Sequence, residues 1–177
     1  MSGAWPGGFA LEAEFFSALS EKAAAKEFQG KLRGIIGKSG GINPVVANRA
    51  NVELAHSLRE TKDFDGASKL YEDVVKKDGV DSSARAGALL GLGKITFEKA
   101  SATDKDAFKQ ALLMFLRVRL ETKDAWPSLQ AEALYYAIQA ADKWRGPEFN
   151  LIMARCRNTL ISEFNGTEWA DRAKAGR

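Results

Sequence analysis

Residues 51–71 read NVELAHSLRETKDFDGASKLY, and the spacing of their apolar and small residues decides the fold. Leu54 and Leu58 lie four residues apart, as on one face of a helix, and Ala67 begins a second run of the same spacing after a polar break. The stretch therefore predicts two helices joined by a short turn. Small residues, Ala55 and Ala67, would lie at their contact, where a larger side chain would push the pair apart.

The same periodicity continues through most of the chain. Apolar residues recur at intervals of three and four, and the alternation typical of strands is almost missing. The sequence therefore predicts an all-α protein. The expected helices lie near residues 9–28, 44–61, 65–77, 82–100, 104–121, 127–144, 147–164 and 167–175.

Polar residues, prolines and glycines mark the expected helix ends. A side-chain oxygen at the N-cap can accept a hydrogen bond from a free backbone N–H, and proline suits the first helical turn. The expected N-caps are Asn43, Asp81-Ser82, Thr103-Asp104 and Thr167. The prolines expected in first turns are Pro44, Pro127 and Pro147, and the glycines expected where helices stop are Gly79, Gly146 and Gly166.

The helices also repeat in pairs, in three copies whose second helices carry a small residue at intervals of 44 and 43 residues. The second copy can be aligned in two registers, on Leu90-Gly91 or on Leu92-Gly93. The copies are Leu54-Ala55 with Ala67-x3-Tyr71, Leu90-Gly91 with Ala111-x3-Phe115, and Leu134-x2-Ala137-Ile138 with Ala154.

This pattern resembles the tetratricopeptide repeat, in which W-x2-L-G-x2-Y precedes A-x3-F. FNGTEWADRA (164–173) and TKDAWPSLQAEALYY (122–136) are similar to helix junctions of bacterial tetratricopeptide proteins, including envelope proteins. The resemblance covers residues 44–175. It implies a right-handed helical-hairpin solenoid of about three repeats over 44–177, preceded by an N-terminal helical extension and glycine-rich hinge over 1–43. A HEAT-like array is the rival fold, because its period of about 40–47 residues fits this chain better than 34.

The resemblance also implies a function and a site. First helices of such repeats line a concave groove, and a repeat array has no closed pocket for chemistry. We therefore expect a non-enzymatic adaptor or scaffold that binds a partner protein or peptide. A structural subunit of a larger assembly is the alternative, and an enzyme ranks last. The expected partner-binding residues are Arg49, His56, Arg59, Arg85, Tyr135, Gln139 and Lys143.

Charge along these first helices suggests what the partner could be. Glu53, Glu98 and Glu132 are expected to fall to the sides of the groove, which would leave its inner surface positive. Cations that face one concavity attract carboxylates. An acidic partner segment is therefore expected, although His56 also fits an ordinary half-exposed surface histidine.

Residues 30–41, GKLRGIIGKSGG, partly match two catalytic motifs. A phosphate-binding loop needs a glycine five positions before Gly37, where Leu32 stands, and it needs a preceding strand. A hydrolase elbow around Ser39 also needs a strand, followed by an acid and a histidine, yet His56 is the only histidine. No catalytic residue is expected. The stretch predicts a helix whose glycines let a neighbour approach, followed by a flexible hinge at 38–41.

Composition excludes several other classes of function. The net charge is +3, and 26 basic residues are scattered among 23 acids, which gives little support to nucleic-acid binding. Cys156 is the only cysteine, so it is expected to be a buried hydrophobe, and no metal or cofactor is expected. No apolar run approaches the roughly 20 residues that span a bilayer. Without a signal-peptide pattern the chain is expected in the cytoplasm, with a bacterial periplasm or envelope as the alternative.

Overall fold

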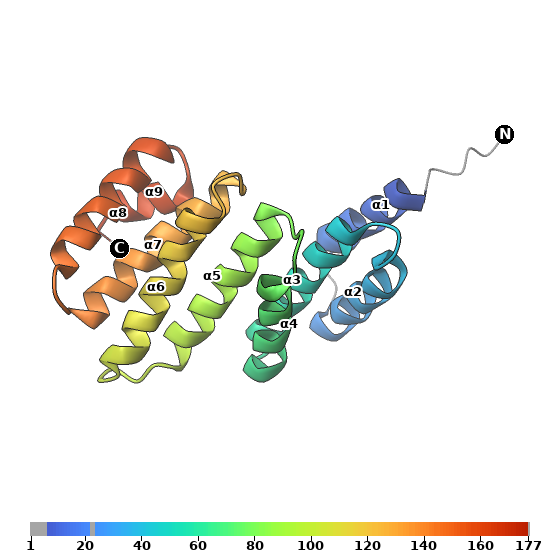
Figure 1. Ribbon diagram of the computed structural model, residues 1–177, viewed down its shortest axis with the longest axis horizontal. Helices are drawn as coiled ribbons and strands as arrows, with labels where there is room; N and C mark the ends of the chain where they lie inside the picture. The colour runs from blue at the N-terminus through green and yellow to red at the C-terminus, as the bar shows by residue number, and fades with distance from the viewer. Residues whose placement is uncertain (1–6, 22–23, 177) are drawn as a thin grey trace. The chain divides into compact units, whose positions relative to one another are not determined.

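The computed structural model describes residues 7–21 and 24–176, which form nine helices and no strand (Figure 1). This confirms the all-α prediction, and neighbouring helices pack in series. The helices are α1 (Gly7–Ser20), α2 (Ala25–Ser39), α3 (Pro44–Glu60), α4 (Phe64–Lys76), α5 (Ser82–Lys99), α6 (Lys105–Glu121), α7 (Pro127–Trp144), α8 (Phe149–Glu163) and α9 (Glu168–Lys174).

The chain divides into two compact units, Met1–Ala84 and Arg85–Arg177. The first contains α1 to α4, and the second contains most of α5 together with α6 to α9. The domain boundary expected near residue 43 is based on the repeat pattern, which these compact units do not test. It therefore stays a prediction.

In the first unit, α3 packs between α2 and α4, and α1 lies against α2 and α3. Ala67 and Tyr71 of α4 are both fully buried, which confirms the prediction that Ala67 lies in the core. Burying the apolar side chains of these helices supplies the driving force for packing, at about 25 cal/mol per Å². The largest buried apolar side chains of α1 to α3 include Leu11, Phe15, Leu32, Ile35 and Leu54.

The prediction of one helix over residues 9–28 is wrong. Two helices occupy the region, because α1 ends at Ser20 and α2 begins at Ala25. Residues 22 and 23 lie outside the described part of the chain. The alanine-rich sequence here favours helix by propensity alone. The chain nevertheless reverses, because the apolar side chains of α1 can then pack back against α2 and α3.

The glycine-rich stretch belongs to α2. Gly37, Lys38 and Ser39 form its last turn, so the predicted hinge begins only at Gly40. Ser39 is fully buried. The expectation that the α2 glycines admit a neighbouring helix is also wrong, because no atom of the described residues lies within 4 Å of a Cβ built on any of the three. These glycines are Gly30, Gly34 and Gly37.

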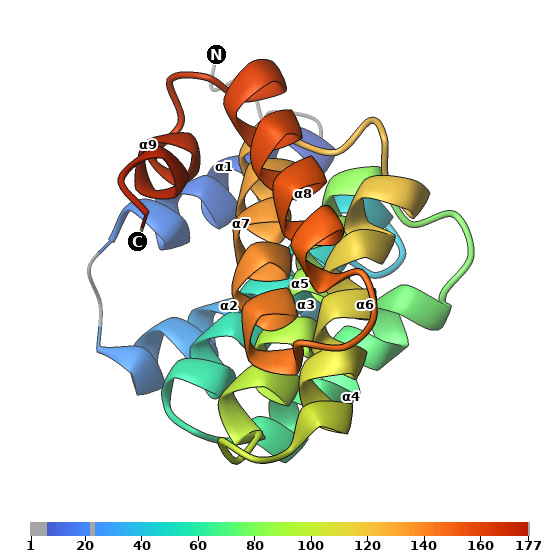
Figure 2. The same ribbon diagram turned by 90° about the vertical axis from the view of Figure 1, so that its left-hand side faces the viewer.

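In the second unit, α7 packs against α6 and α8, and α9 contacts both α7 and α8 (Figure 2). Helix α5 approaches α6 closely at Gly93, where an added Cβ would lie 2.5 Å from Cε1 of Phe115. The Phe97 ring of α5 also meets the Phe108 ring of α6, with centroids 5.4 Å apart. Gly93 is therefore a close-contact residue, which favours the Leu92-Gly93 register of the second sequence copy.

The prediction that Ala154 is the small residue at the helix contact of the third sequence copy is wrong. Ala154 is exposed, whereas Cys156 and Leu160 are the buried residues of α8. Their four-residue spacing matches that of buried Ala111 and Phe115 in α6. The small residue at this position is therefore Cys156, and its burial confirms the prediction made for the cysteine.

Most predicted helix ends are confirmed. The Asn43, Asp81, Asp104 and Thr167 side chains each accept a backbone N–H three residues on. Pro44 and Pro127 occupy first turns. Pro147 does not, because α8 begins at Phe149, after Glu148 takes a left-handed conformation with φ of 60°.

Candidate functional site

The first group of predicted partner-binding residues lies on α3. Arg49, His56 and Arg59 are spaced by seven and three residues, so they share one face of the helix. All three side chains are half-buried. The three residues therefore share one helix face, as predicted. Each of them, however, already contacts another residue of the first unit.

Arg49 holds the start of α5. Its Nε lies 3.4 Å from Oδ1 of Asp81, and the same oxygen accepts the backbone N–H of Ala84. Asp81 therefore caps α5 while it neutralises Arg49. This ion pair joins α3 to the segment that follows α4.

His56 and Arg59 converge on a buried tyrosine. The His56 Nδ1 atom is hydrogen-bonded to the Tyr71 hydroxyl, and the two ring centroids are 5.4 Å apart. The Arg59 guanidinium lies within hydrogen-bonding reach of the same hydroxyl. Burial raises the pKa of Tyr71 far above its ordinary value, although the Arg59 charge opposes this shift. Tyr71 is therefore a neutral phenol that ties α4 to α3.

Two carboxyl groups complete this cluster. Glu53 and Glu60 of α3 both act electrostatically on Tyr71. Burial raises the pKa of Glu53 from 4.5 to about 7, and repulsion by the Glu60 carboxylate adds to the shift. The expectation that Glu53 falls to the side of the cations is wrong, because it belongs to the same cluster.

The second group lies in the second unit. Arg85 is half-buried near the start of α5. Tyr135, Gln139 and Lys143 follow one side of α7 at four-residue spacing, and exposure increases toward Lys143. The sequence therefore placed these three side chains correctly on one side of the helix.

Tyr135 packs against α9. Its ring centroid lies 5.2 Å from that of Trp169, and the Arg172 guanidinium lies 4.7 Å from the Trp169 centroid. Sequence analysis did not include Trp169 in the site. The position of Trp169 in the junction-like stretch 164–173 could have indicated that it packs near α7.

Lys94 and Glu132 form an ion pair beside these aromatic rings. Their side chains are only 12% and 17% exposed, and the Lys94 ammonium lies 5.0 Å from the Tyr136 ring centroid. Glu132 therefore neutralises Lys94 within the second unit. Arg49, one of the cations expected to attract an acidic partner, is likewise paired, with Asp81.

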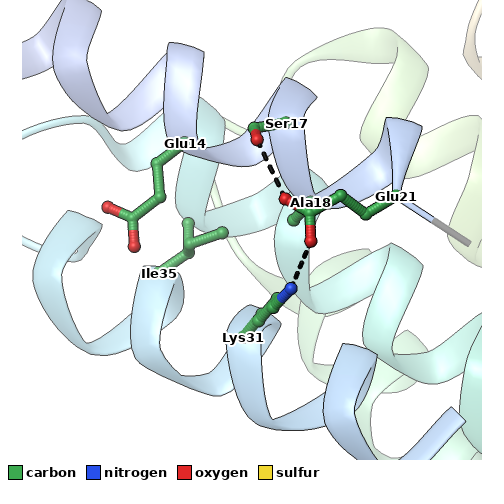
Figure 3. Close-up of a pocket in the computed structure, with 6 residues that line it drawn as sticks. All are labelled: Glu14, Ser17, Ala18, Glu21, Lys31 and Ile35. Atoms are coloured by element: carbon green, nitrogen blue, oxygen red, sulfur yellow. Dashed lines mark hydrogen bonds and ion pairs between the residues drawn. The ribbon is translucent and has the colours of Figure 1, made fainter. Parts of the chain in front are cut away.

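Several cavities open on the surface of the first unit. One of about 230 Å³ lies between α1 and α2 (Figure 3). The Glu21 carboxylate at its rim accepts a hydrogen bond from Ser17 and pairs with Lys31. Glu14 pairs with Lys38. These acids hold α1 on α2, and their charges are satisfied.

Among the described residues, no group of three or more histidine, cysteine or acidic side chains could hold a metal ion. Among the same residues, no helix has the length and apolar character needed to cross a bilayer.

Comparison of the chain with protein-family models found no match, and comparisons with curated proteins and with solved structures found none either.

Proposed function

We propose that the protein is a non-enzymatic adaptor that resembles tetratricopeptide proteins and binds a partner protein or peptide on the exposed face of its first helices. One observation carries the proposal. The α3 and α7 helices begin pairs of antiparallel helices, and each presents half-buried polar and aromatic side chains along one side. Arginine and tyrosine, which this set contains, are enriched at protein interfaces.

The repeat hypothesis is supported by a buried small residue four positions before a large one in three successive second helices. These pairs are Ala67 with Tyr71, Ala111 with Phe115, and Cys156 with Leu160. A repeated small residue lets two helices approach to the same distance in each pair. We propose that this makes a right-handed solenoid of about three repeats.

The second candidate is a structural subunit of a larger assembly. It is favoured by exposed leucines on the outer side of α6, because Leu113 and Leu120 are 52% and 71% exposed and lie seven residues apart on one face. Such a stripe on a helix whose opposite face is already buried suits a second protein surface.

The two candidates differ in the surface that a partner would cover. Peptides selected from a displayed random library should lose binding to the variants His56→Ala and Tyr135→Ala. Binding should persist in the controls Lys69→Ala and Gln110→Ala, which alter exposed positions of α4 and α6. Loss of binding only in Leu113→Ser and Leu120→Ser would instead support the structural subunit. A chain for which no peptide is selected would contradict the adaptor proposal.

A further inference from the structure

A second cavity of the first unit, of about 170 Å³, lies between the first half of α3 and the second half of α4. One water molecule requires only about 10–15 Å³ of such space, so the cavity is large enough for a small ligand group. Asn48 and Asn51 line it from α3. The residues that line it from α4 are Leu70, Asp73, Val74 and Lys77. Its wall therefore combines polar and apolar side chains.

Asn51 contributes to this cavity by its small size. In the tetratricopeptide pattern W-x2-L-G, a tryptophan stands three residues before the leucine. Leu54 is that leucine in the first sequence copy, so Asn51 stands at the tryptophan position. A short amide side chain fills less space there than an indole ring would. The position thus provides a hydrogen-bonding group beside an unfilled volume.

Asn48 supplies an unused donor in the wall of the cavity. Its side chain is only 3% exposed, and its Oδ1 accepts a hydrogen bond from Nζ of Lys77 at 3.0 Å. Because an ammonium group only donates, this contact fixes the orientation of the amide. The Nδ2 group keeps two N–H donors, which have no acceptor among the residues that the structure describes. This atom is not sealed inside the protein, so it faces the cavity that Asn48 lines.

Asn51 supplies an unused acceptor next to this donor. Its Nδ2 donates to the backbone carbonyl of Ala47 at 2.9 Å. A carbonyl only accepts, so the amide orientation is again fixed, and Oδ1 remains without a donor in the described part of the chain. Asn48 and Asn51 are three residues apart and share one side of α3. The helix therefore presents a donor and an acceptor together at one cavity.

We propose that this cavity binds a primary carboxamide, the group that ends a glutamine or asparagine side chain. Its carbonyl oxygen would accept from Nδ2 of Asn48, and its N–H would donate to Oδ1 of Asn51. The attached methylene groups would pack on Leu70 and Val74, which form the apolar part of the wall. The proposal goes beyond the adaptor function, because a partner protein and a free small molecule can both carry this group.

Groups of other chemistry satisfy the cavity less well. A carboxylate could accept from Asn48, but it would leave Asn51 without a donor and would meet the negative charge of Asp73. An ammonium group could donate to Asn51, but it would place another donor beside the Asn48 amide. A buried donor or acceptor that stays unpaired costs binding energy. Only a ligand with both a carbonyl and an N–H pairs both asparagines.

The test follows the side-chain amide signals of Asn48 and Asn51 by NMR of the full chain, which detects weak binding. Propionamide is added as the probe, and propionate, propylamine and butanone serve as analogues of similar size. Propionamide should shift both signals until they saturate. Each analogue should bind at least about tenfold more weakly, because it leaves one of the two asparagines unpaired.

A second set of probes identifies the source of the carboxamide. The peptide Ac-Ala-Ala-Gln-Ala-Ala-NHCH3 is compared with peptides that carry methionine or glutamate at the central position. Shifts of the Asn48 and Asn51 signals by the glutamine peptide alone would assign the cavity to a side chain of a partner. Shifts by propionamide but by none of the peptides would assign it to a free small amide.

Variants place the ligand in this cavity. Asn51→Leu removes the acceptor and fills the volume, so propionamide should no longer shift the Asn48 signal. Asn48→Ala should likewise abolish the shift at Asn51. Because Asn51 is half-buried, its replacement keeps the test valid even if Asn48→Ala disturbs folding. Lys69→Ala provides the control, since Lys69 is an exposed residue of α4 outside the cavity and its replacement should leave binding unchanged.

Four results would overturn the inference. The first is the absence of any saturable shift with propionamide, and the second is equal binding of propionamide and propionate. The third is binding that persists in Asn51→Leu, which would place the ligand elsewhere. The fourth is an equal shift with all three peptides, which would show that the cavity recognises the peptide backbone instead of a side-chain carboxamide.

Discussion

Replacing Glu53 by glutamine should stabilise the protein at pH 8. The substitution keeps the size of the side chain and removes the negative charge. In the folded chain that charge is disfavoured by burial and by Glu60, whereas in the unfolded chain it is surrounded by water. A neutral amide costs less to bury than an unpaired carboxylate.

The magnitude follows from the pKa. Glu53 has a pKa of about 7 in the folded chain against an ordinary value of 4.5. At about 1.4 kcal/mol per pKa unit, this difference corresponds to roughly 3 kcal/mol, which is an upper value because the side chain is only half-buried. The folded chain binds the proton more tightly. The stabilisation by protonated Glu53 is therefore complete below pH 4.5 and is lost as the pH rises through about 7.

Urea unfolding of the two proteins at several pH values measures this effect. Glu53→Gln should raise the free energy of unfolding by about 1–3 kcal/mol at pH 8 and by almost nothing at pH 4.5. Glu72→Gln provides the control, since Glu72 is exposed and its replacement should change stability by less than about 0.5 kcal/mol at either pH. An equal gain at both pH values would refute the reasoning, because the benefit would not then come from the charge of Glu53.

Three further experiments test the packing. Gly93→Ala should lower the free energy of unfolding in urea by about 1–3 kcal/mol, because the new Cβ would meet the Phe115 ring. Gly34→Ala, on the open side of α2, should instead stabilise the protein by up to about 1 kcal/mol. Equal effects of the two substitutions would contradict the close approach of α5 and α6. Ala67→Leu should also cost about 1–3 kcal/mol, and an unchanged melting temperature would place Ala67 outside the core. Burial raises the pKa of the Cys156 thiol to about 11. Iodoacetamide should therefore label this thiol slowly at pH 8 in the folded protein and quickly in urea. Fast labelling of the folded protein would contradict the burial of Cys156.

The helices could be predicted because their ends are set by local interactions. Asn43 and Thr167 cap helices through side chains that contact the backbone three residues away. The break between α1 and α2 could not be predicted in this way. It occurs in an alanine-rich stretch without proline, and it depends on how α1 packs against distant α3. The error at Ala154 has a similar cause, because the sequence spacing does not show which side of α8 packs against α7, and that side carries Cys156 and Leu160.

The candidate site could be predicted only as a set of helix faces. Spacing alone places Arg49, His56 and Arg59 together, because the α-helix fixes which residues share a face. It does not indicate that Asp81 neutralises Arg49, since these residues are brought together by the turn after α4. The pairing of Lys94 with Glu132 also joins different helices. The net charge of a face therefore requires tertiary contacts, and the expected excess of positive charge did not account for them.

The α3–α4 pair and the α5–α6 pair each bury one large aromatic side chain of the second helix, but the two side chains need different surroundings. At the large buried position of the second helix, α6 has Phe115, which needs no polar partner and packs into the space left by Gly93. The corresponding residue of α4 is Tyr71, whose buried hydroxyl must be hydrogen-bonded. His56 of α3 satisfies it and is thereby held half-buried on the same face as Glu53. The Tyr71 hydroxyl thus explains why His56 and Arg59 gather in a polar cluster on the first helix pair, close to Glu53.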